Sequence, residues 1–229
     1  MSSLTRIICT RKMNELDKQE AKRHGFLIVD QDFLSFDYLS DKNIAQVVEN
    51  GLQPFVFTSQ HAVKAVVEIM EQYQIRLINK DCFCIEGKTK QDALHHGFNV
   101  IGEAGNSASL ASVIIADKQQ EIVFFSGNLK REELVSTLTA NNIRVNECVV
   151  YHKSLIPLKI EDDYQGIVFF SPSQVDAFKA INLLPEKVPA FCIGSTTGDY
   201  LDLQGHKNTL VAEQKNIGSV LNKIYEYYQ

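Results

Sequence analysis

Small hydroxyl and amide side chains gather where several apolar, strand-like runs of this chain end. They occur at five such places: Thr10–Arg11, Thr58–Ser59, Ser126–Gly127–Asn128, Ser171–Pro172–Ser173 and Ser195–Thr196–Thr197. In open parallel sheets, ligands bind at the carboxyl ends of the strands. The helix that follows each strand offers unpaired N–H groups and the positive end of its dipole to an anion. The set therefore predicts a site for a ligand with several carboxylates or phosphates.

Each of these residues also has an ordinary structural interpretation, because every helix needs an N-cap. Ser171–Pro172 is typical of a helix start, with serine as the cap and proline in the first turn. Thr89 with Asp92, and Thr196 with Asp199, have the spacing of capping boxes, although aspartate replaces the usual glutamate. Capping alone explains any single residue, whereas the recurrence along the chain favours anion binding.

A few cations lie close to these strand ends: Arg11, Lys12, Lys88, Lys130 and Arg131. Lys130 and Arg131 are equally typical of a solvated first helical turn. The formal net charge of −5 argues against nucleic acid as the main partner. It does not exclude a small polyanion, because backbone amides bind carboxylates without lysines.

Motifs for cofactors, metals and membranes are missing from the sequence. There is no GxGxxG, P-loop or HExxH, so we expect neither a nucleotide cofactor nor a metal. No apolar run reaches the roughly 18 residues of a membrane span. The number of cysteines is odd, and most of them lie in apolar runs. This pattern predicts buried, reduced thiols in a cytoplasmic protein. They are Cys9, Cys82, Cys84, Cys148 and Cys192.

Short apolar strands alternate with amphipathic helices along the chain, and 45% of its residues are hydrophobic. The predicted strands are Arg6–Thr10, Phe26–Val29, Phe55–Thr58, Cys82–Ile85, Ile122–Ser126, Arg144–Tyr151, Ile167–Ser171 and Ala190–Ile193. The predicted helices are 14–24, 60–73, 89–96, 107–116, 129–140, 172–181, 197–204 and 216–227. Strands without polar alternation are covered on both faces, so we expect α/β layers with parallel sheets.

Two segments recur in the same order, which indicates a duplicated half. VFTSQHAVKAV at 56–66 resembles VFFSPSQVDAF at 168–178, and FCIEGKTKQDALHHG at 83–97 resembles FCIGSTTGDYLDLQG at 191–205. Two units at nearly constant spacing favour duplication over a short repeat array. Similar halves usually face each other across a cleft, where ligands bind.

These residues together resemble the uroporphyrinogen-III synthase family over almost the whole chain. The resemblance is carried by the order and spacing of seven segments: ICTR at 8–11, VFTSQHAV at 56–63, Gly87–Thr89, SGNLKREEL at 126–134, NECVVYHKS at 146–154, FFSPS at 169–173 and IGSTT at 193–197. Two positions depart from the family pattern. His61 stands where many members have asparagine or arginine, and Ser195 replaces the usual proline of the IGxTT turn.

The resemblance implies an α/β fold of two similar lobes, each a parallel sheet flanked by helices, joined by a two-stranded connector. One lobe is discontinuous and combines residues 1–33 with 156–229. The other spans residues 38–150. The connector is expected near 34–37 and 151–155, where the helical pattern is poor.

The reaction implied by the resemblance is cyclisation of hydroxymethylbilane with inversion of ring D and loss of water, in tetrapyrrole and haem biosynthesis. Such an enzyme is a cofactor-free lyase, expected to be a cytoplasmic monomer that acts on a linear tetrapyrrole with carboxylate side chains, without nucleic acid or membrane partners. Tyr151 matches the family tyrosine proposed as hydrogen-bond donor or general acid. The matching substrate-binding residues are Thr89, Ser126, Gly127, Asn128, Ser171, Pro172, Ser173, Thr196 and Thr197.

Two other functions are compatible with the same sequence. A non-catalytic two-lobed module that binds a tetrapyrrole or another polyanion would keep the fold without the reaction, and Tyr151 would then be only a packed strand-end residue. A nucleotide-sugar or dinucleotide enzyme could use a similar α/β scaffold. The missing phosphate-loop glycines argue against that second alternative.

Overall fold

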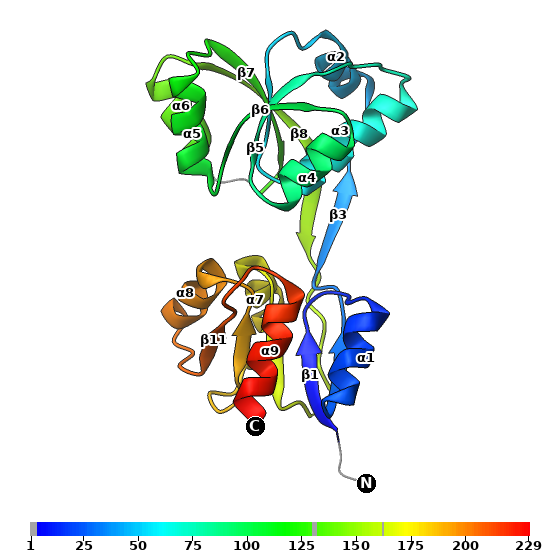
Figure 1. The fold of residues 1–229 in the computed structure, drawn as a ribbon, viewed down its shortest axis with the longest axis vertical. Coiled ribbons are helices and arrows are strands. Elements are labelled where there is room, and N and C mark those ends of the chain that lie inside the picture. The colour runs from blue at the N-terminus through cyan, green and yellow to red at the C-terminus, as the bar shows by residue number, and fades with distance from the viewer. Residues whose placement is uncertain (1–3, 130–131, 162) are drawn as a thin grey trace. The chain divides into compact units, whose positions relative to one another are not determined.

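The computed structural model describes residues 4–129, 132–161 and 163–229 and divides the chain into two compact units. Unit 1 comprises Met1–Ser35 and Ser154–Gln229, and unit 2 comprises Phe36–Lys153. Each unit has a parallel-rich sheet with helices on both faces (Figure 1), which confirms the predicted α/β class. Among the described residues, none of the helices is both long and apolar enough to cross a membrane.

The sheet of unit 1 has the strand order β11-β10-β9-β1-β2, and its strands are parallel. These strands are β1 (Thr5–Cys9), β2 (Phe26–Asp30), β9 (Gly166–Phe169), β10 (Ala190–Cys192) and β11 (Thr209–Val211). The helices of the unit are α1 (Glu15–Arg23), α7 (Pro172–Lys179), α8 (Ser195–Leu203) and α9 (Ile217–Tyr228). Helices α1 and α9 share one buried cluster, whereas α7 and α8 belong to another, so the two pairs cover opposite faces.

The sheet of unit 2 has the strand order β3-β8-β7-β4-β5-β6. Its strands are β3 (Leu34–Tyr38), β4 (Phe55–Phe57), β5 (Asp81–Ile85), β6 (Asn99–Ala104), β7 (Glu121–Gly127) and β8 (Arg144–Leu155). Its helices are α2 (Lys42–Asn50), α3 (Gln60–Gln72), α4 (Lys88–His95), α5 (Ser107–Ala116) and α6 (Glu133–Ala140). Both β3 and β8 continue across the division between the units, because their outer residues belong to unit 1.

Each sheet has a point at which its strand order reverses. In unit 1 the chain proceeds from β1 to β2 on one side, and from β9 to β10 and β11 on the other. In unit 2 it proceeds from β4 to β5 and β6 on one side, and from β7 to β8 on the other. Ligands of open α/β sheets bind in the crevice at such a switch point. The two switch points lie between β1 and β9 and between β4 and β7.

Three elements were not predicted, namely β6, β11 and α2, and β3 was expected only as one strand of the connector. Strands β3 and β6 carry mixed polar and apolar residues with only partial burial, so they lack the continuous apolar run of the other strands. Strand β11 has three residues, none of them buried. Helix α2 buries only Ile44, Ala45 and Val48. Short or half-buried elements give a weak periodic signal, and their neighbours decide their conformation.

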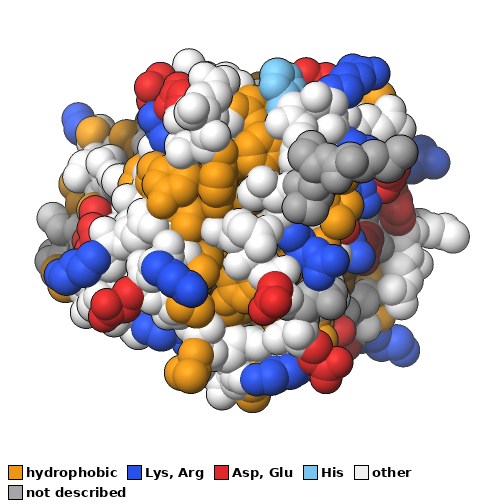
Figure 2. All heavy atoms as spheres, turned by 90° about the horizontal axis from the view of Figure 1, so that it is seen from below, with side chains coloured by type: hydrophobic (Ala, Val, Ile, Leu, Met, Phe, Trp, Pro, Cys, Tyr) orange, Lys and Arg blue, Asp and Glu red, His pale blue; other side chains and the backbone are white. Residues whose placement is uncertain are grey.

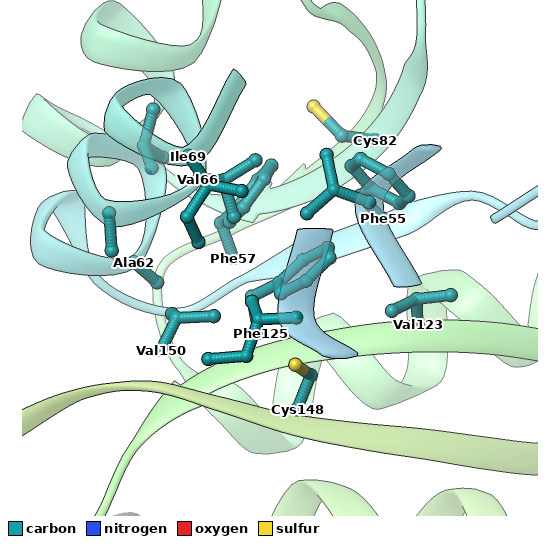
Figure 3. Close-up of a cluster of buried hydrophobic side chains, with 14 of the residues drawn as sticks. Phe55, Phe57, Ala62, Val66, Ile69, Cys82, Val123, Phe125, Cys148 and Val150 are labelled. Atoms are coloured by element: carbon teal, nitrogen blue, oxygen red, sulfur yellow. The ribbon is translucent and has the colours of Figure 1, made fainter. Parts of the chain in front are cut away.

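Phenylalanines of adjacent strands form the centre of the unit 2 core. Phe55 and Phe57 of β4 and Phe125 of β7 are fully buried, and the rings of Phe55 and Phe125 meet edge to face at 4.8 Å between centroids (Figure 3). Cys82 and Cys148 lie in the same cluster (Figure 3). All the cysteines are buried, as predicted.

Replacing Phe125 with alanine should destabilise the protein by about 3–5 kcal/mol, because a fully buried ring leaves a cavity in a close-packed core. Chemical denaturation followed by circular dichroism measures this difference. Leu52→Ala is the matched control, since Leu52 belongs to the same unit but is 91% exposed. Equal stability of the two variants would contradict this description of the core.

Candidate functional site

The predicted polar residues cluster at the carboxyl ends of the strands within each unit. In unit 1, the ends of β1, β9 and β10 carry Thr10–Arg11, Ser171–Ser173 and Ser195–Thr197. In unit 2, the ends of β4, β5 and β7 carry Thr58–Ser59, Lys88–Thr89 and Ser126–Asn128. The predicted residues therefore surround both switch points. Lys130 and Arg131 lie outside the described residues.

Helix N-termini differ in how they are capped, and the helices that follow the predicted site residues are of both kinds. Five helices have an N-cap side chain that accepts a hydrogen bond from the first turn: Asn14 of α1, Asp41 of α2, Ser59 of α3, Asn106 of α5 and Asn216 of α9. In the described part of the chain, α4, α6, α7 and α8 have no such side-chain bond. Their first-turn N–H groups are the ones that a carboxylate could bind.

The capping boxes predicted at Thr89 and Thr196 were wrong. The N-caps are Gly87 and Gly194, which have no side chain, so each threonine is the second residue of its helix. Gly87 has φ 79°, a left-handed conformation that glycine adopts at low cost. Glycine at both positions leaves the helix N-terminus open.

Ser171 and Ser59 are both N-cap residues, but among the described residues only Ser59 forms a capping hydrogen bond with its side chain. Ser171 is the N-cap of α7 with Pro172 in the first turn, as predicted, but its Oγ is buried and has no hydrogen-bond partner among the described residues. Ser59 is a true cap, because its Oγ accepts the N–H of His61 at 3.1 Å. The Oγ of Ser126, whose residue is 2% exposed, also lacks a described partner.

At the unit 1 switch point, Thr10 and Arg11 have different surroundings. Thr10 is fully buried, and its hydroxyl donates to the Val168 carbonyl at 2.8 Å. Arg11 is half-buried and places its guanidinium 3.9 Å from the centre of the Phe170 ring. Burial lowers the pKa of Arg11, although a guanidinium stays charged in proteins. Arg11, and not Thr10, therefore presents a polar group at the surface.

Tyr151 packs closely against the end of β7. The ladder between β7 and β8 shifts register so that Gly127 faces Tyr151, and a Cβ on Gly127 would meet the ring, with the hydroxyl only 2.9 Å away. Asn128 fixes the same segment, because its N–H donates to the Tyr151 carbonyl and its Oδ1 accepts the N–H of Lys153. The SGN segment thus shapes the position of Tyr151.

Two opposing effects act on the Tyr151 hydroxyl. Burial raises its pKa, whereas a hydrogen bond with the side chain of Ser59 lowers it. The net direction is upward, so the phenol keeps its proton at neutral pH. A protonated phenol can donate a hydrogen bond or a proton to a departing hydroxyl group.

A second group of residues beside Tyr151 was not predicted from the sequence. The His61 ring stacks on Phe36 with 3.6 Å between centroids, its Nδ1 lies 2.9 Å from the Tyr38 hydroxyl, and the Tyr151 ring is 5.8 Å away. Burial and three nearby lysines lower the pKa of His61 to about 4, so the imidazole is neutral at pH 7. These lysines are Lys64, Lys153 and Lys88.

Spacing in the sequence could have identified two of these lysines. Lys64 follows His61 by three positions on α3, so both lie on one helix face. Lys153 follows Tyr151 by two positions on β8, so both point to the same side of the sheet. Phe36 and Tyr38 lie on β3, which was not predicted as part of a sheet.

The remaining predicted residues differ in exposure. Thr58, which follows β4, is half-buried. In the first turn of α8, Ser195 and Thr196 are exposed, whereas Thr197 is 3% exposed. Lys88 is the exposed first residue of α4. A search of residues 4–129, 132–161 and 163–229 finds no cluster of three or more His, Cys, Asp or Glu that could hold a metal ion.

A cavity of about 780 Å³ lies at the opposite end of the unit 1 sheet, where the strands begin. Its lining includes Gln165 and Pro189, which directly precede β9 and β10, together with Tyr227 and Tyr228 of α9. Figure 2 shows this end of the unit, with hydrophobic side chains gathered near its centre. The lining also contains Glu161 and Asp163. These two acids outweigh the charge of Lys187, which also lines the cavity, so the cavity does not favour a ligand rich in carboxylates.

Comparison with known proteins gives consistent results. The family model "HEM4: Uroporphyrinogen-III synthase HemD" matches residues 18–222. A uroporphyrinogen-III synthase of Saccharomyces cerevisiae is 26% identical over an alignment that covers 82% of each chain. Two solved structures share the fold at 17% identity and cover 98% of this chain and 100% of their own: the Helicobacter pylori enzyme, with TM-score 0.70, and a Thermus thermophilus mutant enzyme, with TM-score 0.73.

Gly127→Ala should displace the Tyr151 ring, because the added Cβ has no room and Tyr151 is only 9% exposed. We expect a loss of about 1–3 kcal/mol in the free energy of unfolding, as for other overpacked sites. Denaturation measures the loss. Gly105→Ala is the control, since its Cβ would meet only Glu86 Oε2 at an ordinary 3.7 Å. A Gly127 variant as stable as the Gly105 variant would refute the close packing.

Acidification should destabilise the protein partly through His61. The unfolded imidazole takes up its proton near pH 6.5 and the folded one only near pH 4, so between these values the unfolded state binds more protons. Stability therefore falls as the pH falls through this window. Melting temperatures between pH 7 and 4.5 should fall less steeply in His61→Gln than in the parent protein. Parallel pH profiles would show that the imidazole is not held neutral.

Proposed function

The chain belongs to the uroporphyrinogen-III synthase family and has the activity of a uroporphyrinogen-III synthase, a hydro-lyase of tetrapyrrole biosynthesis, and we propose how its residues carry out that reaction. The substrate is hydroxymethylbilane, a linear tetrapyrrole with two carboxylates on each pyrrole. The observation that supports our assignment most strongly is that α4, α7 and α8 begin at the carboxyl edges of their sheets without a capping side chain.

The substrate carboxylates would bind to these helix N-termini. Backbone N–H groups and the positive helix dipole favour a negative charge there. Exposed Ser195 and Thr196 can add hydroxyl donors in unit 1, and Lys88 and Thr89 lie at the start of α4 in unit 2. Much of this binding is by backbone, so single side-chain changes in these turns should have small effects.

Cations near each switch point would supply the remaining attraction. Arg11 lies over the Phe170 ring in unit 1, where its guanidinium can bind a carboxylate through two parallel hydrogen bonds. In unit 2, the charges of Lys64, Lys88 and Lys153 all act on the His61 site, next to Tyr151. His61 itself is neutral and contributes a ring surface and hydrogen bonds without adding charge.

Tyr151 would act as the acid in the first chemical step. The carbon–oxygen bond of the hydroxymethyl group breaks, the phenol gives its proton to the departing oxygen, and water leaves. The electrons of the pyrrole stabilise the resulting azafulvenium cation, and the phenol is left as a phenolate. The terminal carbon is then attacked by the substituted carbon of ring D, which gives a spiro intermediate that fragments and recloses. The proton lost when the last pyrrole regains aromaticity restores the phenol.

The main catalytic contribution would be positional. The free bilane cyclises spontaneously to the isomer without ring inversion, so the enzyme must direct the closure. Holding a flexible four-ring chain in a curled conformation lowers the entropic part of the barrier. This role needs many modest contacts along the substrate. We further propose that the enzyme acts as a cytoplasmic monomer without a cofactor.

A coupled assay tests this function directly. Hydroxymethylbilane is generated in situ with and without this protein, and the oxidised products are separated into I and III isomers. A protein-dependent shift to the III isomer supports the proposal. Production of the I isomer alone, by folded protein, would contradict it and favour a binding module that has lost the reaction.

Tyr151→Phe should lower turnover on the order of 100-fold, because general acid catalysis typically contributes about that much or more. The variant should stay folded, since it loses only the hydroxyl group and its bond with Ser59. The coupled assay with purified variants measures the change. Tyr164→Phe is the control, because its hydroxyl donates to the Leu183 carbonyl at 3.5 Å, outside the predicted site. Unchanged turnover would remove Tyr151 from the mechanism.

A further inference from the structure

The side-chain amide of Gln174 is inserted between β1 and β9. Gln174 lies in the first turn of α7, and it is only 5% exposed. Its Oε1 accepts the N–H of Phe170 at 2.8 Å, and its Nε2 donates to the carbonyl of Thr10 at 3.0 Å. The Thr10 hydroxyl lies 3.1 Å from the same Oε1. One side chain therefore ties together the carboxyl ends of two strands.

The amide takes the place of a ladder hydrogen bond. The parallel ladder pairs Cys9 with Val168, and the Thr10 N–H still donates to the Val168 carbonyl at 3.2 Å. In a regular parallel ladder, the next bond would join the Phe170 N–H to the Thr10 carbonyl. Both groups bind the Gln174 amide instead, so the strands are held apart at the switch point of the sheet.

Helix capping does not explain this arrangement. In a capping box, a glutamine at this position reaches back to the N–H of the N-cap residue. Gln174 reaches past the N-cap, Ser171, to the preceding residue, Phe170. The other half of a capping box is also missing, because α7 has no side-chain cap bond among the described residues.

The two residues that Gln174 fixes are those from which the Arg11–Phe170 pair extends. Arg11 directly follows Thr10, and its guanidinium rests 3.9 Å from the Phe170 ring centre. We propose that Gln174 is a positioning residue for substrate binding, which holds the ends of β1 and β9 apart and thereby places the Arg11 guanidinium for a substrate carboxylate. This inference rests on the proposed function, in which Arg11 binds the substrate.

Gln174→Met tests the role, because methionine has a similar length and cannot form these hydrogen bonds. Without the amide, the Phe170 N–H can bond directly to the Thr10 carbonyl, and the crevice narrows. We expect kcat/KM to fall about 10-fold, mainly through KM, as when a charge-assisted hydrogen bond is lost. Gln174→Glu keeps the acceptor for Phe170 but loses the donor to Thr10, so it should shift KM in the same direction if the methionine variant does not fold.

Asn182→Leu is the matched structural control. Asn182 is another buried amide, 8% exposed, just beyond the end of α7, and it bonds Ile160 N–H and the carbonyls of Leu158 and Phe178. Its replacement should lower stability as much as Gln174→Met does and leave KM unchanged. A similar rise in KM in both variants, or an unchanged KM in Gln174→Met, would overturn the proposal.

A double-mutant cycle with Arg11→Ala separates the positioning role from the proposed function. If Gln174 acts through Arg11, its substitution should have little further effect on KM in the Arg11→Ala protein. Additive effects would overturn the positioning role and leave Arg11 as a substrate-binding residue. An Arg11→Ala protein with unchanged KM would instead refute substrate binding by Arg11, and with it the role assigned to Gln174.

Discussion

Unpaired N–H groups at the start of a helix must find a hydrogen-bond acceptor, and this requirement organises the whole molecule. Five helices meet it with an aspartate, asparagine or serine at the N-cap. Helices α4, α6, α7 and α8 do not, in the part of the chain that the structure describes, and each follows the carboxyl end of a strand. In the proposed function, the carboxylates of the substrate would supply the missing acceptors. The backbone N–H groups at the starts of these helices would then form hydrogen bonds with the ligand.

Close contacts between neighbouring segments fix the positions of the other residues of the proposed site. Gly127 leaves room for the Tyr151 ring, and Asn128 ties the end of β7 to the backbone around that tyrosine. In unit 1, the Gln174 amide separates β1 from β9 beneath Arg11. Residues that looked like ligand contacts in the sequence thus divide into two kinds. Some face the surface, and others, such as Thr10, hold the surface residues in place.

The α/β class, the apolar strands and most helices followed from the sequence, because continuous burial on both faces leaves a strong pattern in the residues. The pattern of β3 was too weak, and with it Phe36 and Tyr38 were missed as neighbours of His61. Capping could not be judged from sequence either. Thr89 and Thr196 have capping-box spacing, yet the N-cap of each helix is a glycine two residues before the threonine. The insertion of Gln174 between β1 and β9 could not be predicted, because it depends on how these two strands pair. They are about 160 residues apart in the chain, and the sequence alone does not give their register.

The most direct test of carboxylate binding by uncapped helices is an amide NMR titration of the intact protein with uroporphyrin III, the oxidised form of the product. Binding at the helix N-termini predicts shifts for the amides of Lys88 and Thr89 in α4 and of Ser195 and Thr196 in α8. The first-turn amides of α1, α2 and α9, which already have side-chain acceptors, should not move. Shifts confined to the cavity beside Tyr227 and Tyr228, or shifts at the capped helices alone, would contradict it.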